Sequence, residues 1–275
     1  MNRVNMTIVF IGYDGYSDLW YDCVRLYKKN WPDCPFRTIF VNNSKNFKDA
    51  GIEVLHAGDD AEWSNKVKVA IEEVDTPYIC LLLEDFYLGD IVDTEKVMRT
   101  LQFINKENLR YYKLVNMNRA VRNHDKSYKG YRFLPVIPKS DEYGVSLQAA
   151  IWEKQYLIEL LGEGNYNAWK FEFDRVKESQ GKSDEPQDGC VFDDRNILHL
   201  QHGVIQGEFL PLTIRYFRKK GIHLNIKRNV MSLRKYCKLR MISKAKYTIP
   251  KQYRNAVKRI MEKLGMKFVS TVRDK

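Results

Sequence analysis

The sequence of 275 residues has no apolar run long enough to cross a membrane. Its longest apolar runs, residues 6–12 and 78–83, fall far short of the roughly 20 residues that a spanning helix needs. The N-terminus also lacks the basic segment and the small-residue cleavage site of a secretory signal. We therefore expect a cytoplasmic protein.

Cysteine motifs are missing as well. The five cysteines are odd in number and widely spaced, which excludes a disulfide framework and a zinc-binding spacing. We expect reduced thiols at Cys23, Cys34, Cys80, Cys190 and Cys237. The sequence also shows no internal repeat and no helix-turn-helix or RNA-recognition signature.

The composition is that of a globular protein, because 44% hydrophobic and 13% aromatic residues suffice to build a core. The charge is unevenly placed. Residues 213–275 contain 20 Lys and Arg against two Asp and Glu, whereas the rest of the chain is mildly acidic. A basic segment of this kind normally meets phosphate, either on nucleic acid or on anionic lipid.

Strands and helices are predicted to alternate in the first hundred residues. Apolar runs predict strands at 6–12, 36–43, 52–58 and 77–85, and helical spacing predicts helices at 21–31, 63–74 and 92–107. This alternation is typical of an open α/β sheet that is mostly parallel and flanked by helices. Ligands of such sheets bind beyond the carboxyl ends of the strands, and two of these ends are the acidic stretches GYDG (12–15) and EDF (84–86).

The second half of the chain has a mixed pattern. Strands are predicted at 111–118 and 132–138, and residues 143–164 read as a strand or loop that turns into a helix. Residues 165–181 fit either a strand or a helix. Long polar connections around 120–130 and 179–190 are typical of functional lids or disordered segments.

The basic C-terminal segment contains an amphipathic pattern at 252–268, with apolar residues on one side and Lys and Arg on the other. Such a helix suits the surface of an anionic bilayer. The alternative is a helix that packs on the body of the protein and exposes its basic face to solvent.

Several stretches, taken in order from about residue 6 to 210, resemble bacterial GT-A glycosyltransferases of capsule and surface-polysaccharide synthesis. They are GYDGYSDLW (12–20), YKKNWPDCPF (27–36), residues 63–88, SLQAAIWEKQYLIELL (146–161), WKFEF (169–173) and, more loosely, HGVIQGEF (202–209). The resemblance implies a GT-A domain at 1–212, with a nucleotide-sugar half at about 1–118 and an acceptor half at about 119–212. The basic helical extension at 213–275 would follow it.

For the donor, the resemblance implies a nucleotide site after the first strand. Gly12 would let the backbone approach, Tyr13 would stack, and Asp14 would accept hydrogen bonds from the base or sugar. A turn that merely ends a strand is the alternative. Ser64 is predicted to cap a helix and, with Lys66, to face the diphosphate, because a helix N-terminus and an ammonium both favour anions.

The pair Glu84 and Asp85 stands where the resemblance places an acidic motif that binds a divalent metal. Phe86 occupies the last acidic position of that motif and cannot ligate. Either Asp85 is the ligand in a shifted frame, or Lys and Arg neutralise the diphosphate without a metal. Magnesium or manganese would suit such a site, and His202, preferred over His199, would be a further ligand. Two acids capping a turn and a histidine in the core are the alternatives.

For the acceptor, Glu172 or Asp174 would deprotonate the hydroxyl, because neighbouring aromatic residues raise the pKa of a carboxyl group. Glu172 is preferred because the resemblance places an acid at this position of the WKFEF stretch. An amphipathic strand edge is the alternative for this stretch. Gln148, Trp152 and Trp169 would line the acceptor pocket, although Trp152 fits the core equally well.

The leading interpretation is a glycosyltransferase that uses a nucleotide-sugar donor, a UDP-sugar, and a lipid-linked or oligosaccharide acceptor. The basic segment would hold it on the anionic inner face of the plasma membrane. A nucleic-acid-binding protein is one alternative, disfavoured by the acidic body. A sugar nucleotidyltransferase is another, but that class usually has a Gly-rich basic loop after the first strand. A non-catalytic interaction protein is the third.

Overall fold

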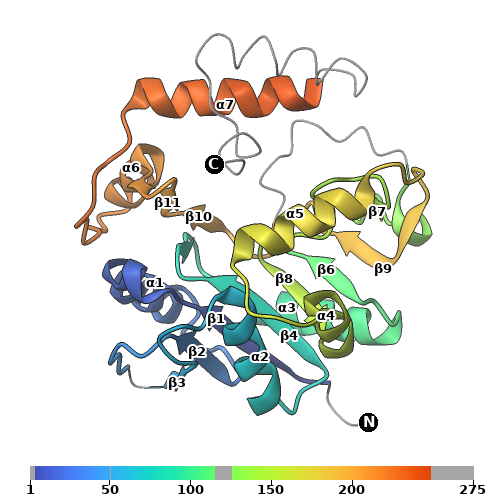
Figure 1. Cartoon of the computed structure of the whole chain (residues 1–275), viewed down its shortest axis with the longest axis horizontal. Coiled ribbons are helices and arrows are strands. Elements are labelled where there is room, and N and C mark those ends of the chain that lie inside the picture. The colour runs from blue at the N-terminus through green and yellow to red at the C-terminus, as the bar shows by residue number, and fades with distance from the viewer. Residues whose placement is uncertain (1–3, 50, 115–125, 249–275) are drawn as a thin grey trace. The chain divides into compact units, whose positions relative to one another are not determined.

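The structure is a computed structural model that describes residues 4–49, 51–114 and 126–248, with side chains up to residue 242 (Figure 1). The chain divides into two compact units, and within the described residues the second begins at Met231. Helix α6 (Pro211–Lys219) belongs to the first unit, where Phe217 is fully buried in the core. The predicted domain boundary at residue 212 is therefore too early, since the core continues past it.

The first unit is built on an eight-stranded sheet in the order β3-β2-β1-β4-β8-β6-β9-β7. Pairing is parallel except where β8 meets β4 and β6 and where β7 meets β9, so six strands run one way and two run the other. The predicted mixed, mostly parallel sheet is thus confirmed. Its strands are β1 (Met6–Ile11), β2 (Thr38–Asn42), β3 (Glu53–His56), β4 (Tyr78–Leu83), β6 (Tyr111–Lys113), β7 (Val136–Pro138), β8 (Ala150–Glu153) and β9 (Pro186–Phe192).

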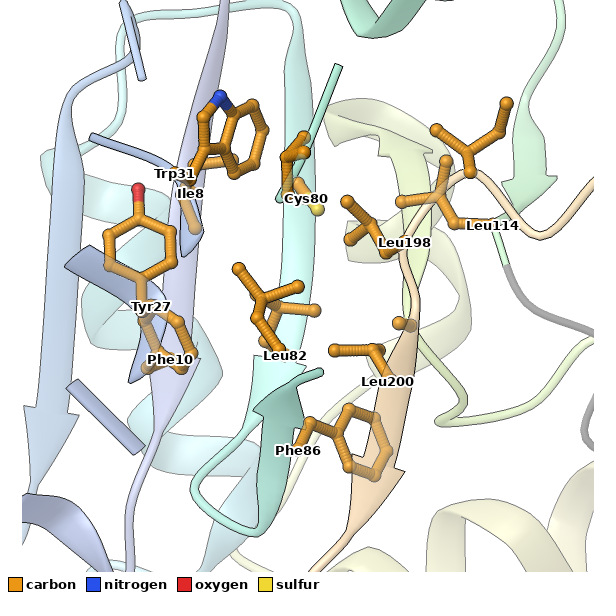
Figure 2. Packing of buried hydrophobic residues seen from close by; sticks show 14 of the residues in the cluster. Ile8, Phe10, Tyr27, Trp31, Cys80, Leu82, Phe86, Leu114, Leu198 and Leu200 are labelled. Atoms are coloured by element: carbon orange, nitrogen blue, oxygen red, sulfur yellow. The ribbon is translucent and has the colours of Figure 1, made fainter. Parts of the chain in front are cut away.

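Helices pack on both faces of this sheet, which explains why its central strands are apolar without interruption. Side chains alternate between two core clusters along β1, with Phe10 in one cluster and Val9 in the other. The first cluster takes in α1 (Ser17–Asn30), α3 (Thr94–Lys106) and α6, and Figure 2 shows part of it around Phe10, Leu82 and Leu200. The second takes in α2 (Trp63–Glu73), α4 (Lys154–Leu161) and α5 (Ala168–Ser179).

Two short sheets complete the first unit. Strand β5 (Phe86–Leu88) follows β4 after only two residues and pairs antiparallel with β10 (Leu200–His202). Strands β11 (Val204–Ile205) and β12 (Glu208–Phe209) form a small hairpin. The β5–β10 pairing brings the stretch around His202 to the end of the central strand β4.

Residues 165–181, which fitted either a strand or a helix, contain the helix α5. The side chain of Asn167 caps this helix by accepting the Lys170 backbone N–H at 3.0 Å. The polar connection predicted at 179–190 is shorter than expected, because β9 begins at Pro186. All five cysteines are unpaired thiols, as predicted.

The second unit contains α7 (Leu233–Thr248), which carries six Lys and Arg and no acidic residue. The amphipathic stretch 252–268 lies outside the described residues. Within the part of the chain that the structure describes, no helix is both long and apolar enough to cross a bilayer.

Candidate active site

The parallel strands β1, β2 and β4 end at one rim of the sheet. Ile11 lies level with Val41 on one side and with Leu83 on the other. The residues that follow these positions, among them Tyr13 and Glu84, are therefore carried to the same edge. This is the place where ligands bind in open α/β sheets.

Asp14 fixes the shape of this rim. Its Oδ1 accepts the backbone N–H of Asn43 at 3.0 Å, and its Oδ2 accepts those of Ser44 at 3.1 Å and Lys45 at 2.7 Å. Both oxygens thus hold the loop after β2, and we assign Asp14 to positioning instead of the predicted contact with a base or sugar.

Lys66 places a buried ammonium at the rim. The residue is only 3% exposed, and its Nζ donates to Asn43 Oδ1 at 3.0 Å and lies 5.3 Å from the centre of the Tyr13 ring. Burial lowers the pKa of Lys66, whereas the charges of Glu84 and Asp14 oppose this shift. The helix α2, which supplies Lys66, therefore brings a cation to the ends of β1, β2 and β4.

Glu84 is a buried carboxyl group beside this lysine. Burial raises its pKa to about 8, the neighbouring Asp85 adds to the rise, and backbone hydrogen bonding and the Lys66 charge oppose it. The relative exposure of Glu84 is 8%. Glu84 therefore belongs to the same buried cluster of charges as Lys66, on whose pKa it acts.

Asp85 and His202 come together next to this cluster. Asp85 Oδ2 lies 3.9 Å from His202 Nδ1, and the two side chains are 16% and 26% exposed. Their approach is fixed by the hydrogen bond from Gly203 N–H to the Asp85 carbonyl at 2.7 Å and by the edge of Phe86, whose ring centre lies 4.8 Å from that of His202. His199, directly before β10, is exposed and bonds to Asn196 instead.

The spacing of this pair is wider than that of neighbouring ligands on one ion. Two adjacent ligands of an octahedral ion with bonds of about 2.1 Å lie about 3.0 Å apart, so Asp85 and His202 would have to move closer together to share a cation. No group of three or more His, Cys, Asp or Glu side chains with metal-ligand spacing occurs among the described residues. Phosphate and water oxygens would have to complete the coordination, as is usual for magnesium.

Glu172, the predicted base, projects from α5 toward the start of β8. Its Oε1 accepts the Leu147 backbone N–H at 2.6 Å, while Oε2 is buried without a partner. Desolvation raises the pKa of Glu172, and the Leu147 bond and the charges of Lys113 and Arg175 oppose the rise. Asp174 differs, since it pairs with Lys170 at 2.7 Å on the exposed side of the helix.

Two of the three predicted acceptor residues are accessible. Trp169 is 59% exposed on α5, and Gln148 is half-buried just before β8. Leu81, near the end of β4, pairs with Ala150, the first residue of the antiparallel strand β8, so the residues just before β8 lie near the rim. Gln148 belongs to this segment, and Glu172 is tied to it by its hydrogen bond with Leu147.

Trp152 does not belong to this site. It is fully buried in β8, with ring contacts to Tyr111, Tyr156 and Phe171. The prediction of an acceptor contact is wrong here, because the side chain points into the core cluster under α4 and α5.

Ser64 and Gly12 also have structural roles that differ from the predicted ones. Helix α2 begins at Trp63, so Ser64 is not its cap; the Ser64 Oγ accepts the Tyr166 N–H at 2.8 Å and is fully buried. A Cβ at Gly12 would lie 2.6 Å from the Phe40 ring. Gly12 therefore makes room for the core behind the rim and not for a ligand in front of it.

Asn43 was missed by the sequence reasoning. It is 5% exposed and joins three parts of the rim, because its Oδ1 accepts from Lys66 while its Nδ2 donates to the carbonyls of Ala61 at 2.7 Å and Gly58 at 3.1 Å. The sequence does contain a signal for Asn43, because it directly follows the apolar strand in the stretch FVNN (40–43), where residues of a ligand site are expected. Two pockets formed by described residues lie elsewhere, and no residue of the rim lines either of them.

No protein-family model matches the chain, and no curated protein does. Several solved structures overlap with it weakly. One is S. aureus TarS 1–349, with 12% identity, a TM-score of 0.40, and 70% of this chain and 60% of that chain covered. Another is an active-site mutant of LgtC, with 11% identity, a TM-score of 0.36 and 77% of each chain covered. A third is a cytidylyltransferase from Leptospira borgpetersenii, with 11% identity, a TM-score of 0.38, and 65% of this chain and 72% of that chain covered.

This chain therefore spans about 60% of the TarS segment that it matches. Overlaps of this degree do not separate a glycosyltransferase from a nucleotidyltransferase. The function has to be argued from the rim itself.

Proposed function

We propose that the chain is a GT-A glycosyltransferase that moves a sugar from a nucleotide-diphosphate donor, a UDP-sugar, to a hydroxyl of a lipid-linked or oligosaccharide acceptor. The observation that carries this proposal is the convergence, at the ends of β1, β2 and β4, of a buried ammonium with an acid–histidine pair. An ammonium and a cation-binding pair at one edge are suited to a pyrophosphate, which carries several negative charges.

In this proposal the donor lies across the rim. The exposed ring of Tyr13 offers a stacking surface for the base, and Lys66 below it offers a positive charge to the diphosphate. Asp14 and Asn43 keep the loop after β2 in place. A magnesium or manganese ion held by Asp85 and His202 would stabilise the negative charge of the leaving diphosphate.

The acceptor would approach from the side of α5. Trp169 offers an indole face for a sugar ring, and Gln148 offers hydrogen bonds. Glu172 would take the proton of the acceptor hydroxyl on Oε2 while that hydroxyl oxygen bonds to the anomeric carbon and the bond to the diphosphate breaks. Its raised pKa supports the choice of Glu172 over Asp174.

The basic second unit supports a location at the inner face of the plasma membrane. Each Lys or Arg near an anionic surface contributes about 1 kcal/mol, and α7 carries six without an opposing acid. A lipid-linked acceptor would then be within reach of a protein without a spanning helix in its described part.

The proposal is tested by the thermal midpoint of the full chain with UDP, UDP-GlcNAc, CTP and ATP, each with and without Mn²⁺. A ligand that binds only the native state raises the midpoint. We expect UDP and UDP-sugars to do so, and Lys66→Met to reduce the shift. Stabilisation by CTP alone would favour a nucleotidyltransferase, and no stabilisation by any nucleotide would exclude the donor site.

A further inference from the structure

A pocket of about 540 Å³ lies in the first unit between β7, α4 and α5, away from the rim. Its volume is in the range of sites for small organic ligands. Ile137, Val145 and Leu160 form apolar parts of its wall, and Lys139, Lys182 and Arg175 form cationic parts. None of these residues has a role in the proposed transfer reaction.

Arg175 is the most unusual residue of this wall. Its side chain is only 10% exposed, and its Nη2 donates to Glu178 Oε1 at 2.5 Å. Its Nε and Nη1 are buried without a hydrogen-bond partner among the described residues, and the guanidinium carbon lies 5.0 Å from the centre of the Phe171 ring. Buried N–H groups without acceptors are costly, so this guanidinium has unused capacity to bind an anion.

The acids of the wall do not satisfy this capacity. Glu185 is held by Lys139 at 3.2 Å, and Asp141 accepts the backbone N–H of Tyr143 at 3.2 Å. Glu178 meets only one nitrogen of Arg175, and its own side chain is 58% exposed, so it can move into solvent. Lys182 is exposed at the same wall and adds a second positive charge.

We propose that this pocket binds a small organic anion, a phosphate monoester or a carboxylate, through the guanidinium of Arg175. The anion would displace Glu178 from Nη2 and gain a second N–H from Nη1 after a small rotation of the planar group. A guanidinium binds such anions well because its fork matches two oxygens at once. The apolar wall would cover the body of the ligand, and Lys182 would add attraction from the pocket mouth.

The test uses the full chain and four probes at constant ionic strength: inorganic phosphate, glucose 6-phosphate, glucuronate and, as the neutral control, glucose. Binding is measured by calorimetry and by the thermal midpoint. We expect at least one anion to bind and glucose not to bind. A phosphate ester that binds while glucuronate does not, or the reverse, identifies which kind of anion the site selects.

Four variants tie the binding to this pocket. Arg175→Met keeps the volume of the side chain and removes the unpaired N–H groups, so we expect a folded protein that no longer binds the anion. Lys182→Met should weaken binding several-fold, and Glu178→Gln should strengthen it because it removes the negative charge that competes with the ligand for Nη2. The control is Arg99→Met on the exposed side of α3, where side-chain exposure is 66%. It should bind like the wild type.

The proposal is overturned if no anion binds, or if Arg175→Met binds as well as the wild type. Should Arg175→Met not fold, an unchanged affinity in both Lys182→Met and Glu178→Gln has the same meaning. Loss of anion binding in Arg175→Met distinguishes this pocket from the proposed donor site, since Arg175 does not belong to the rim. The UDP response of Arg175→Met should equal that of the wild type.

Discussion

Asp85 Oδ2 and His202 Nδ1 lie 3.9 Å apart, although Asp85 lies in the turn between β4 and β5 and His202 lies in the distant strand β10. The antiparallel pairing of β5 with β10 produces this approach, since it sets His202 opposite Phe86 and hence beside Asp85. Neither residue alone is a metal site. In the proposed function, together they would offer one carboxylate oxygen and one imidazole nitrogen to a cation whose coordination a diphosphate would complete.

Removal of either member of this pair should abolish the metal-dependent part of UDP binding. We expect Asp85→Ala and His202→Ala to retain at most the UDP stabilisation that the wild type shows in EDTA, because one ligand cannot hold the ion. The thermal midpoint with UDP, with and without Mn²⁺, measures this.

The matched control for this experiment is His199→Ala, which removes a nearby exposed histidine and should keep the full manganese effect. If the wild type responds equally to UDP with manganese and with EDTA, the metal proposal fails. Lys66 would then be the main charge facing the diphosphate.

Glu172→Gln should lower the transfer rate by about 100- to 10,000-fold, the usual contribution of a general base. Gln can still accept the Leu147 N–H but cannot take a proton, so donor binding should not change. Sugar transfer is measured by release of UDP once a donor has been found. Asp174 pairs with Lys170 on the exposed side of α5, so Asp174→Asn should keep wild-type activity. Equal losses in both variants would contradict the assignment.

The same substitution should change how stability depends on pH. Burial raises the pKa of Glu172 in the folded state, so the folded protein binds more protons than the unfolded one between the unfolded and the folded pKa. As the pH rises through that window, the ionisation of Glu172 lowers the free energy of unfolding. Below the unfolded pKa the group is protonated in both states and has no such effect. Urea unfolding should show Glu172→Gln gaining stability over the wild type at pH 8 but not at pH 4.

Charge on α7 should control attachment to membranes. Reversal of Arg234, Lys238 and Arg240 to Glu should reduce binding to phosphatidylglycerol vesicles by at least about 100-fold, given about 1 kcal/mol for each charge near the surface. Vesicle sedimentation at low and high salt measures this. The same reversal at Lys48, Lys106 and Lys177, all exposed in the first unit, is the control and should have a much smaller effect.

The sheet could be predicted from the sequence because its signals are local. The continuous apolar runs that became β1, β2 and β4 are typical of strands covered on both faces, and their order along the chain implies that their ends meet. The convergence of Tyr13, Lys66 and Glu84 follows from that order.

The remaining features depend on contacts between distant segments. Trp152 and Trp169 look alike in the sequence, but one lies in the middle of a covered strand and the other on the open side of a helix. Asp14 binds a loop about thirty residues away, which no local pattern encodes. The start of α2 was misjudged for a different reason: Ser64 has the chemistry of a cap, but Trp63 already has helical geometry before it.

Strand β8 runs against β4 and β6, between which it lies. It therefore starts at the edge where its neighbours finish, and the segment leading into it shares that edge with the residues after β4. Changes of length or sequence before residue 150 can reshape the half of the edge next to α5 while the turns after β1 and β2 stay as they are. In the proposed reaction, such changes would alter the contacts to the acceptor and leave the contacts to the donor unchanged.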